Sequence, residues 1–493
     1  MSRFLLLVLM CFPLAAKQLD KVTIALEHPA NGNMVHLDNA GLLAVSGFSQ
    51  FDRWLSLVNL ADYQVQPIVI PANAQYFSQA SLVDHHKANT SFAAGRAFPV
   101  HQALVFLTLD GISVYNAERM QSEPLLVSPS IYRVLDKNRL RSGDFVLQLG
   151  SDQADFLLPD FNQSHLFRQQ PDGSFLQYSL NIGAQVTSWR DSPSYEPRRH
   201  FIVDVDLDGR LDLAFIAGGK FQVFYQLADG GFNTEPVTQN WPVSLSTEQE
   251  ADQRNDAGRS YTGQNIDSLR DIIDIDGDGV ADLVVNREQL ADALERNNSF
   301  RVHFGLRTAT GLHFNAEPDT RITTDTSPID VVIADFNADG RKDFYIPSTH
   351  FGVGTIVRVL LRGSANLDID FYLLNEQRQY SSKADFKQNA TIDVSISNLR
   401  YDMPLFELAD LDGSGQLSLI VGEGGDELKF YGPEPGRLFS RRPERVKLDL
   451  PRDARKVLVA DLTGNGKDDL VLPFDAQDAE QTRNQLLLLL NPK

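Results

Sequence analysis

The sequence of 493 residues contains a single cysteine, Cys11, and this residue lies in an apolar stretch at the N-terminus. The rest of the chain therefore has no disulfide bond to stabilise it. A secreted protein without disulfides must gain its stability from a large hydrophobic core or from bound ions. With 42% hydrophobic residues the chain is rich enough to form such a core.

Positive charge is also scarce. The chain has 45 lysines and arginines against 65 aspartates and glutamates, which gives a formal net charge of −20. Binding to nucleic acid requires a basic surface, so a nucleic-acid partner is excluded. Bound divalent cations would offset part of the negative charge.

Long hydrophobic runs are absent as well. The longest candidate runs from Phe4 to Ala16 after the basic Arg3, and it is shorter than the roughly 20 residues that a membrane-spanning helix needs. Its length and the small residues at its end predict a signal peptide over residues 1–16, with a buried N-terminal strand or helix as the alternative. We therefore expect no transmembrane segment, a secreted protein (extracellular or periplasmic), and a single mature domain over residues 17–493.

What the sequence does contain is a repeated acidic motif. Five segments carry oxygen-bearing side chains at positions 1, 3, 5 and 9, glycine at position 6, and a strand-like apolar run behind them. They recur at intervals of roughly 50 to 75 residues, which indicates an internal repeat. The side chains at positions 1, 3, 5 and 9 are Asp204, Asp206, Asp208 and Asp212; Asp274, Asp276, Asp278 and Asp282; Asp335, Asn337, Asp339 and Asp343; Asp410, Asp412, Ser414 and Ser418; and Asp461, Thr463, Asn465 and Asp469.

This spacing is typical of a calcium loop. Calcium takes six to eight oxygen ligands, which alternate side chains of a tight turn can supply, and the glycine permits the turn. Position 7 is expected to contribute its backbone carbonyl, and it is occupied by Arg210, Val280, Arg341, Gln416 and Lys467. We therefore predict three to five structural Ca²⁺ sites. Metal-free Asp/Gly turns are the alternative, above all for the loop at Asp410, which has only two carboxylates.

An EF-hand is excluded by position 12. That motif needs a bidentate glutamate there and a helix on each side. The five residues at this position are all apolar and lie in strand-like runs: Phe215, Val285, Ile346, Val421 and Leu472.

The segments around the loops predict four short strands per repeat. An apolar run precedes each loop and a second follows it. A third lies further on, for example "FRVHFG" (300–305) in one repeat and "IVRVLL" (356–361) in another, and a turn often leads from it to a fourth. A radial array of four-stranded meanders is a β-propeller, so the fold class is all-β. The only clear helix candidate is "REQLADALERN" (287–297).

The first third of the chain keeps this rhythm without the acidic loops. Residues 144–175 form one such unit, in which Asp155 retains position 9 while Leu147 and Leu149 replace acids. Residues 103–116 and 42–60 are the middle strands of two earlier units. This gives eight blades, with seven as the alternative count. The last unit lacks an outer strand, and we expect "KVTIAL" (21–26) to supply it and close the ring.

The D-x-D-x-D-G-x-x-D-L loops resemble the VCBS/FG-GAP repeats of bacterial secreted proteins, which are related to the N-terminal propeller of integrin α subunits. The resemblance is clearest over residues 200–475. It implies a propeller with calcium in the loop between the first two strands of a blade. The chain lacks the Phe-Gly…Gly-Ala-Pro signature of the stricter pattern, and it contains no Arg-Gly-Asp motif.

Two functions fit these observations. The first is a non-enzymatic, calcium-stabilised scaffold for binding or adhesion to a protein or glycan. The alternative is an extracellular polysaccharide-active enzyme, a lyase or hydrolase, with its site at the central channel.

Two polar insertions, 254–265 and 378–391, are expected to project before blades as binding loops or plain connectors, and "DHH" (84–86) is expected in a polar loop. The sequence leaves the ligand and the oligomeric state open.

Overall fold

The structure is a computed structural model, and it describes residues 19–83, 100–134, 140–189, 192–251, 263–290, 296–324, 326–349, 353–395 and 400–492. The predicted signal peptide, residues 1–16, and the "DHH" segment lie outside these ranges, as does most of the predicted insertion 254–265.

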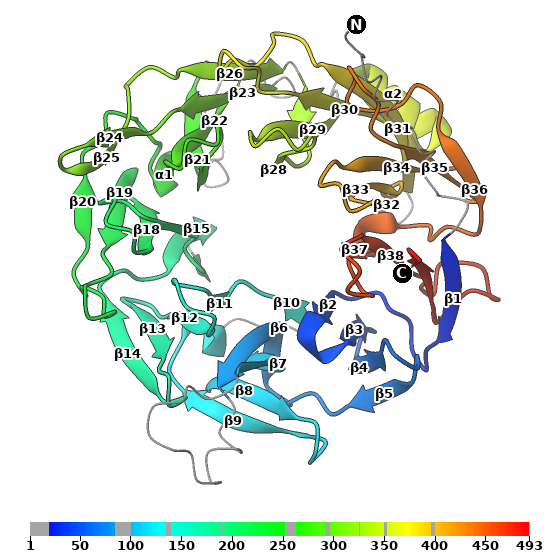
Figure 1. Ribbon diagram of the computed structural model, residues 1–493, viewed down its shortest axis with the longest axis horizontal. Helices are drawn as coiled ribbons and strands as arrows, with labels where there is room; N and C mark the ends of the chain where they lie inside the picture. The colour runs from blue at the N-terminus through cyan, green and yellow to red at the C-terminus, as the bar shows by residue number, and fades with distance from the viewer. Residues whose placement is uncertain are drawn as a thin grey trace, which may run out of the picture.

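Eight β-sheets form a ring around a central channel, so the chain is an eight-bladed β-propeller (Figure 1). In a typical blade the first strand lies nearest the channel and the fourth lies at the rim, and one blade has a short additional innermost strand, β10 (Arg141–Ser142). We number the blades I to VIII along the chain. Blade I contains β2 (Met34–Leu37), β3 (Leu42–Phe48), β4 (Arg53–Asn59) and β5 (Val65–Ile68); blade II contains β6 (Ala74–Val83), β7 (Val100–Thr108), β8 (Gly111–Asn116), β9 (Gln121–Val127) and β10 (Arg141–Ser142); blade III contains β11 (Val146–Leu147), β12 (Asp155–Pro159), β13 (Ser164–Gln169) and β14 (Phe175–Leu180).

The remaining blades follow the same meander. Blade IV contains β17 (His200–Val203), β18 (Asp212–Ala217), β19 (Lys220–Phe224) and β20 (Val237–Gln239); blade V contains β21 (Asn265–Ile273), β22 (Asp282–Leu290), β23 (Arg296–His303) and β26 (Thr320–Thr324); blade VI contains β27 (Ser327–Pro328), β28 (Val332–Ala334), β29 (Asp343–Thr349), β30 (Ser364–Tyr372), β31 (Phe386–Ser395) and β32 (Arg400–Asp402); blade VII contains β33 (Phe406–Ala409), β34 (Ser418–Glu423), β35 (Glu427–Tyr431) and β36 (Glu444–Lys447); blade VIII contains β37 (Leu458–Ala460), β38 (Asp469–Pro473), β39 (Gln485–Leu490) and β1 (Asp20–Ala25).

Few other elements occur in the described residues. Two hairpins stand outside the blade sheets: β15 (Gln185–Trp189) with β16 (Ser192–Glu196), and β24 (Leu306–Thr308) with β25 (Gly311–His313). The helices are α1 (Glu248–Ala251), α2 (Val353–Arg362), and the 3₁₀ turns η2 (Asp38–Ala40), η3 (Ile131–Val134) and η5 (Ala454–Lys456). Among the described residues, no helix combines the length and the hydrophobicity needed to cross a bilayer.

The hydrophobic core lies mainly between neighbouring blades. Strand side chains alternate between the two faces of a sheet, and in a propeller each face packs against the next blade. One buried cluster joins Ala44 and Leu57 of blade I to Phe77 and Phe106 of blade II. Another joins Phe300 of blade V to blade VI. Each blade is therefore stabilised by both of its neighbours.

The N-terminal strand belongs to the last blade. β1 pairs with β39 in antiparallel register, with Asp20 opposite Leu490 and Ala25 opposite Gln485. Ile24 packs in a buried cluster that also contains Leu43 of blade I and Leu488 of blade VIII. The first and last parts of the chain thus share one sheet.

Three local predictions were wrong. Residues 287–297 are not a helix where they are described: Arg287 lies in β22 and its guanidinium binds both carboxylate oxygens of Asp267 on β21, at 2.7 and 2.6 Å. This cross-strand pair favours sheet over the helix-forming composition. Residues 356–361 lie in α2 and the third strand is β30, because a short apolar run fits either structure. Residues 378–391 do not precede a blade; they connect β30 to β31 and enter β31 within blade VI.

Removal of residues 21–26 should leave the outer edge of β39 unpaired. The backbone N–H and C=O groups along this edge of β39 (Gln485–Leu490, one glutamine and five leucines) would then be free to pair with strands of other chains. We expect aggregation or a large fall in melting temperature, measured by light scattering and calorimetry. Unchanged melting of a monomeric deletion variant would show that this strand does not close the ring.

Candidate metal centres

All five acidic loops connect the first and second strands of a blade, as the sequence predicted from the resemblance. They belong to blades IV to VIII, and position 9 is in each case the first residue of the second strand: Asp212, Asp282, Asp343, Ser418 and Asp469. The loops therefore lie on one and the same face of the ring, because every blade has the same strand order.

Each loop is closed by its position 1 carboxylate. In the first loop, Asp204 Oδ1 accepts a hydrogen bond from the Asp208 N–H at 3.0 Å and Oδ2 accepts one from the Gly209 N–H at 2.8 Å. The carboxylates of Asp274, Asp335, Asp410 and Asp461 accept equivalent bonds from the N–H of the position 6 glycine at 2.7 to 2.9 Å. Part of the acidity of this motif thus serves the turn itself.

Two positions of each loop have a left-handed backbone. The position 6 glycines have φ between +77° and +88°, a conformation that fits the sharp turn expected at this glycine. Position 4 is also left-handed, with φ of +61° at Leu207 and +58° at Ala338. Left-handed φ is unfavourable for residues other than glycine, so the residue types at these two positions did not predict this backbone conformation.

Position 9 is buried and binds the backbone on both sides. Asp282 Oδ2 accepts from the Ile275 N–H within the loop, and Oδ1 accepts from the Gly305 N–H after the third strand, both at 2.7 Å. Asp212, Asp343 and Asp469 make the same pair of bonds in their blades. These aspartates are at most 1% exposed, so each one connects three strands of a blade from within.

Burial also disfavours the charged form of these carboxylates. It raises the pKa of Asp212 and Asp469 to about 6 and that of Asp282 and Asp343 to about 7. A cation bound beside them would favour the ionised form. Metal binding would therefore release protons, and it would weaken as the pH falls.

The side chains converge in two of the five loops. Single carboxylate oxygens of Asp204, Asp206 and Asp208 lie within 4.8 Å of one another, and so do those of Asp274, Asp276 and Asp282. No further group of this kind occurs in the described part of the chain. The loops at Asp335, Asp410 and Asp461 have the same backbone but fewer acids, since Asn337, Ser414, Thr463 and Asn465 replace them.

The donor set fits a hard cation. All the candidate ligands are oxygens, which calcium prefers. The position 3 atom Thr463 Oγ1 is buried and has no hydrogen-bond partner among the described residues. A buried polar atom without a hydrogen bond is costly, and a bound cation would satisfy it. If calcium binds, positions 1, 3, 5 and 9 would hold it and its charge would neutralise the clustered carboxylates.

Arginines lie beside several of these carboxylates. The guanidinium groups of Arg210 and Arg341, at position 7, pair with the position 5 carboxylates Asp208 and Asp339. Arg378, from the β30–β31 connection of the next blade, pairs with Asp276 and lies 4.1 Å from the centre of the Phe304 ring. The sequence could not identify Arg378, because it is about 100 residues from its partner along the chain.

Blade III contains an arginine where its loop lacks acids. Asp155 is fully buried at position 9 and accepts from the Gln169 N–H at 3.1 Å. The Arg168 guanidinium lies 3.5 Å from Asp155 Oδ2, donates to Leu149 O at 3.1 Å, and also donates to Gly230 O of blade IV. Burial raises the pKa of Asp155, and the Arg168 charge opposes that rise. In this blade a guanidinium supplies the positive charge next to the position 9 carboxylate.

Neighbouring loops are bonded to one another. The Lys342 N–H donates to Ile275 O at 2.6 Å, which joins the loops of blades V and VI. The Leu417 N–H donates to Phe336 O at 3.1 Å, and the Asp468 N–H donates to Asp410 O at 2.8 Å. An unbroken series of backbone hydrogen bonds thus links the loops of blades V to VIII.

Comparison with known proteins identifies no family for this chain. No protein-family model matches it, and no curated protein does. Solved structures that match include an Agrocybe aegerita lectin described as recognising non-reducing terminal N-acetylglucosamine (13% identity, 88% of this chain and 95% of that chain, TM-score 0.43). The Dos1 propeller matches at 9% identity (96% and 95%, TM-score 0.44), and Saccharomyces cerevisiae Sqt1 matches at 9% (95% and 98%, TM-score 0.41). At these scores the matches carry no argument about function.

Replacement of Arg168 by glutamine should destabilise the propeller independently of calcium. The variant leaves the Asp155 carboxylate buried without its cation, which costs about 3 kcal/mol or more. We expect an equal fall in melting temperature in calcium and in chelator. Arg445→Gln, which breaks an exposed pair with Glu427, is the control and should change stability by less than about 1 kcal/mol. A loss no larger than that of the control would contradict the role of Arg168.

Proposed function

We propose that the chain is a secreted, calcium-stabilised β-propeller that acts as a binding scaffold for a protein or a glycan. The observation that carries this proposal is the set of repeated acidic loops, two of which bring three carboxylates together. The loops hold their own strands and contact the loops of the next blades. In this arrangement the metal ligands stabilise the ring, and the solvent-exposed surface outside the loops is available for a partner.

Calcium is the ion that best fits the role. Loops of this kind in extracellular proteins bind calcium with Kd values of about 10⁻⁴ to 10⁻³ M, which matches calcium levels outside cells. The predicted signal peptide places the protein in the same environment. Since the described residues include no cysteine, bound ions would supply the cross-links that disulfides supply in other secreted proteins.

Calcium should raise the melting temperature of the protein, since an ion that binds only the folded state stabilises it by RT ln(1 + [Ca²⁺]/Kd). Asp276→Ala should lose more of this rise than Asp412→Ala, because the loop of Asp276 has four carboxylates and that of Asp412 has two. The quantity to compare is the shift between calcium and chelator, since Asp276→Ala also removes the partner of Arg378.

The absence of any shift in the wild-type protein would exclude calcium stabilisation. Equal losses in the two variants would instead show that the number of carboxylates does not set the affinity of a loop.

Binding should be tested with arrays of glycans and of cell-surface proteins, probed in calcium and in chelator. We expect retention of at least one partner in calcium and a loss of about tenfold or more in chelator, because the ring loosens without its ions. Mass spectrometry of the recovered partner should show no chemical change. A partner that is cleaved or eliminated would favour the polysaccharide-active enzyme instead.

A further inference from the structure

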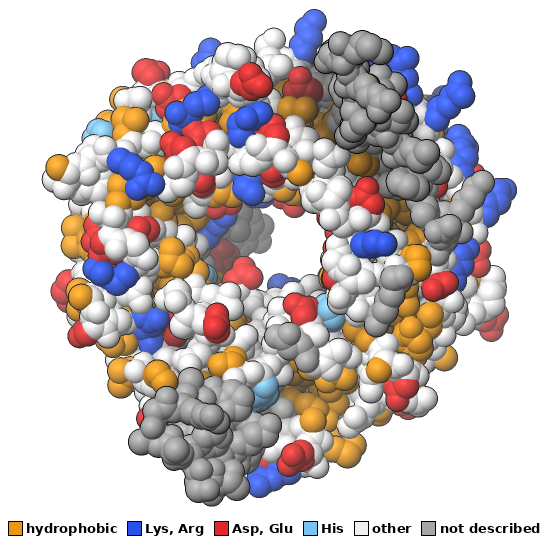
Figure 2. Space-filling view, in the orientation of Figure 1, with side chains coloured by type: hydrophobic (Ala, Val, Ile, Leu, Met, Phe, Trp, Pro, Cys, Tyr) orange, Lys and Arg blue, Asp and Glu red, His pale blue; other side chains and the backbone are white. Residues whose placement is uncertain are grey.

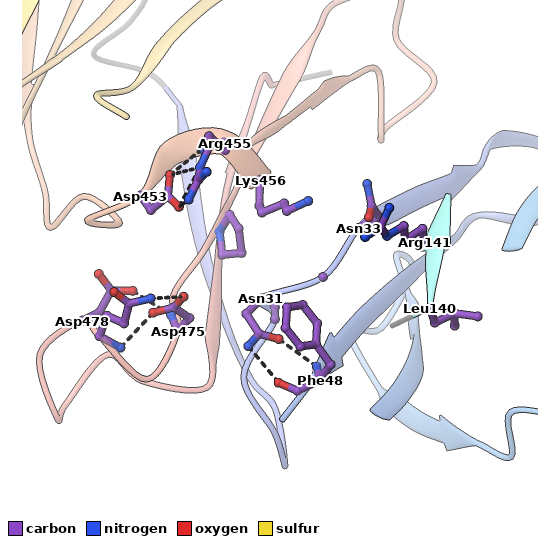
Figure 3. A pocket seen from close by; sticks show the side chains of 14 residues that line it. Asn31, Asn33, Phe48, Leu140, Arg141, Asp453, Arg455, Lys456, Asp475 and Asp478 are labelled. Atoms are coloured by element: carbon purple, nitrogen blue, oxygen red, sulfur yellow. Dashed lines mark hydrogen bonds and ion pairs between the residues drawn. The ribbon is translucent and has the colours of Figure 1, made fainter. Parts of the chain in front are cut away.

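A polar cavity of about 530 Å³ lies at the junction of blades VIII, I and II. Its walls come from the linker before β2, the end of β3, the residues around β10, the segment that contains η5, and the β38–β39 connection (Figure 3). Turns between second and third strands lie at the opposite end of a blade from turns between first and second strands. The cavity is therefore on the face of the propeller away from the acidic loops, and β2, β10 and β37 lie next to the channel (Figure 1).

The polar groups of this cavity are held in place by hydrogen bonds. The Asn31 side chain donates to Phe48 O at 3.0 Å and accepts from the Phe48 N–H at 2.8 Å. Arg455 Nε lies 2.9 Å from each carboxylate oxygen of Asp453. Asp478 accepts from the Arg452 N–H at 2.8 Å and from the Asp475 N–H at 2.6 Å. Such fixed groups lower the entropy cost of binding a ligand.

An irregularity of blade II supplies a cation. β10 is a two-residue strand that pairs in parallel with β6, with Arg141 opposite Tyr76, and it adds a fifth strand to this blade. Arg141 is exposed, and its guanidinium has no hydrogen-bond or ion-pair partner among the residues that the structure describes. Across the cavity, Lys456 extends toward Asn33, beside which Arg141 lies (Figure 3). Arg141 and Lys456, from β10 and η5, thus each contribute a cationic side chain to the lining of this cavity.

Three aspartates also line the cavity: Asp453, Asp475 and Asp478. Asp453 is neutralised by Arg455, whereas Asp475 and Asp478 stand on the β38–β39 connection (Figure 3). Asp475 accepts from the backbone N–H and the side-chain amide of Gln477, and Asp478 accepts from two backbone N–H groups. A carboxylate has about four lone-pair sites, so both side chains can also accept hydrogen bonds from hydroxyl groups. A ligand with many negative charges, such as a polyphosphate, would be repelled by this pair. One anionic group near Arg141 and Lys456 would not be.

One aromatic side chain lines the cavity, and a second is exposed nearby in the sequence. Phe48 lines it, and Phe51, in the turn that follows, is 86% exposed. An aromatic ring presents a flat apolar face on which the C–H groups of a sugar ring can pack. The volume lies within the range of about 300 to 1,000 Å³ that is typical of small-molecule sites.

We propose that this cavity binds an acidic saccharide, with the anionic group of the sugar at Arg141 and Lys456 and its hydroxyl groups at Asp475 and Asp478. The proposal rests on the binding function proposed above and identifies the ligand class and the site. A carboxylate and a sulfate ester would satisfy the same cations, so the experiment must distinguish them.

The test is calorimetric titration of the purified protein, in calcium, with three probes: trigalacturonate, monosulfated lactose and neutral maltotriose. At least one acidic probe should bind about tenfold more tightly than maltotriose, because a charge-assisted contact is stronger than a neutral one. Arg141→Ala should weaken that binding about tenfold, and Arg141→Lys should restore part of it. Arg445→Ala, at an exposed pair on blade VII, should leave it unchanged. Equal melting temperatures would confirm that the variants fold.

An acidic probe that binds Arg141→Ala as tightly as the wild type would place the saccharide elsewhere and overturn the site, while the scaffold function would stand. Failure of both acidic probes to bind, with a protein partner found on the array, would overturn the saccharide class alone. Binding of maltotriose as tight as that of the acidic probes would overturn the role of the cations.

Discussion

The buried carboxylate at the start of the second strand is the interaction on which the blades depend. In blades III, IV, V, VI and VIII an aspartate at this position accepts backbone hydrogen bonds that join it to strands on either side. A buried charge of this kind is tolerated only when hydrogen bonds and a nearby cation offset its loss of hydration. The five aspartates are at most 1% exposed. The proposed calcium ions would provide such an offset.

The blades meet that need in different ways. In blade III the Arg168 guanidinium stands beside Asp155. In blades IV and V the clustered loop carboxylates, which would repel one another, form a set of ligands suited to calcium. In blade VII, Ser418 replaces the aspartate and removes the charge. The acidic motif, the arginine and the serine thus occur in different blades at the same position of the repeat.

The two faces of the ring have different chemistry. On the face with the acidic loops, main-chain hydrogen bonds connect the loops of blades V to VIII, which suits a structural role. The opposite face carries the cavity between blades VIII, I and II, whose side chains are fixed but still present charged and aromatic groups to solvent. Figure 2, a space-filling view in the orientation of Figure 1, shows the open channel, with acidic and basic side chains scattered around its rim.

The sequence by itself determined the blade, because its information is local. The D-x-D-x-D-G spacing fixes a turn through hydrogen bonds within six residues, and the apolar runs on either side fix the strands, so the propeller, the eight blades and the position of the five loops were all predictable. Asp155 was also recognised without its acidic neighbours.

Only the tertiary structure decided which groups face these loops and what lies between blades. Arg378, Arg168 and Arg141 reach their places through pairing with other blades or through an added strand, and the cavity is built from segments hundreds of residues apart. The short apolar run 356–361 became helix α2, because such a run fits either structure. The helix-like run at Arg287 became strand, because cross-strand contacts outweigh local preference.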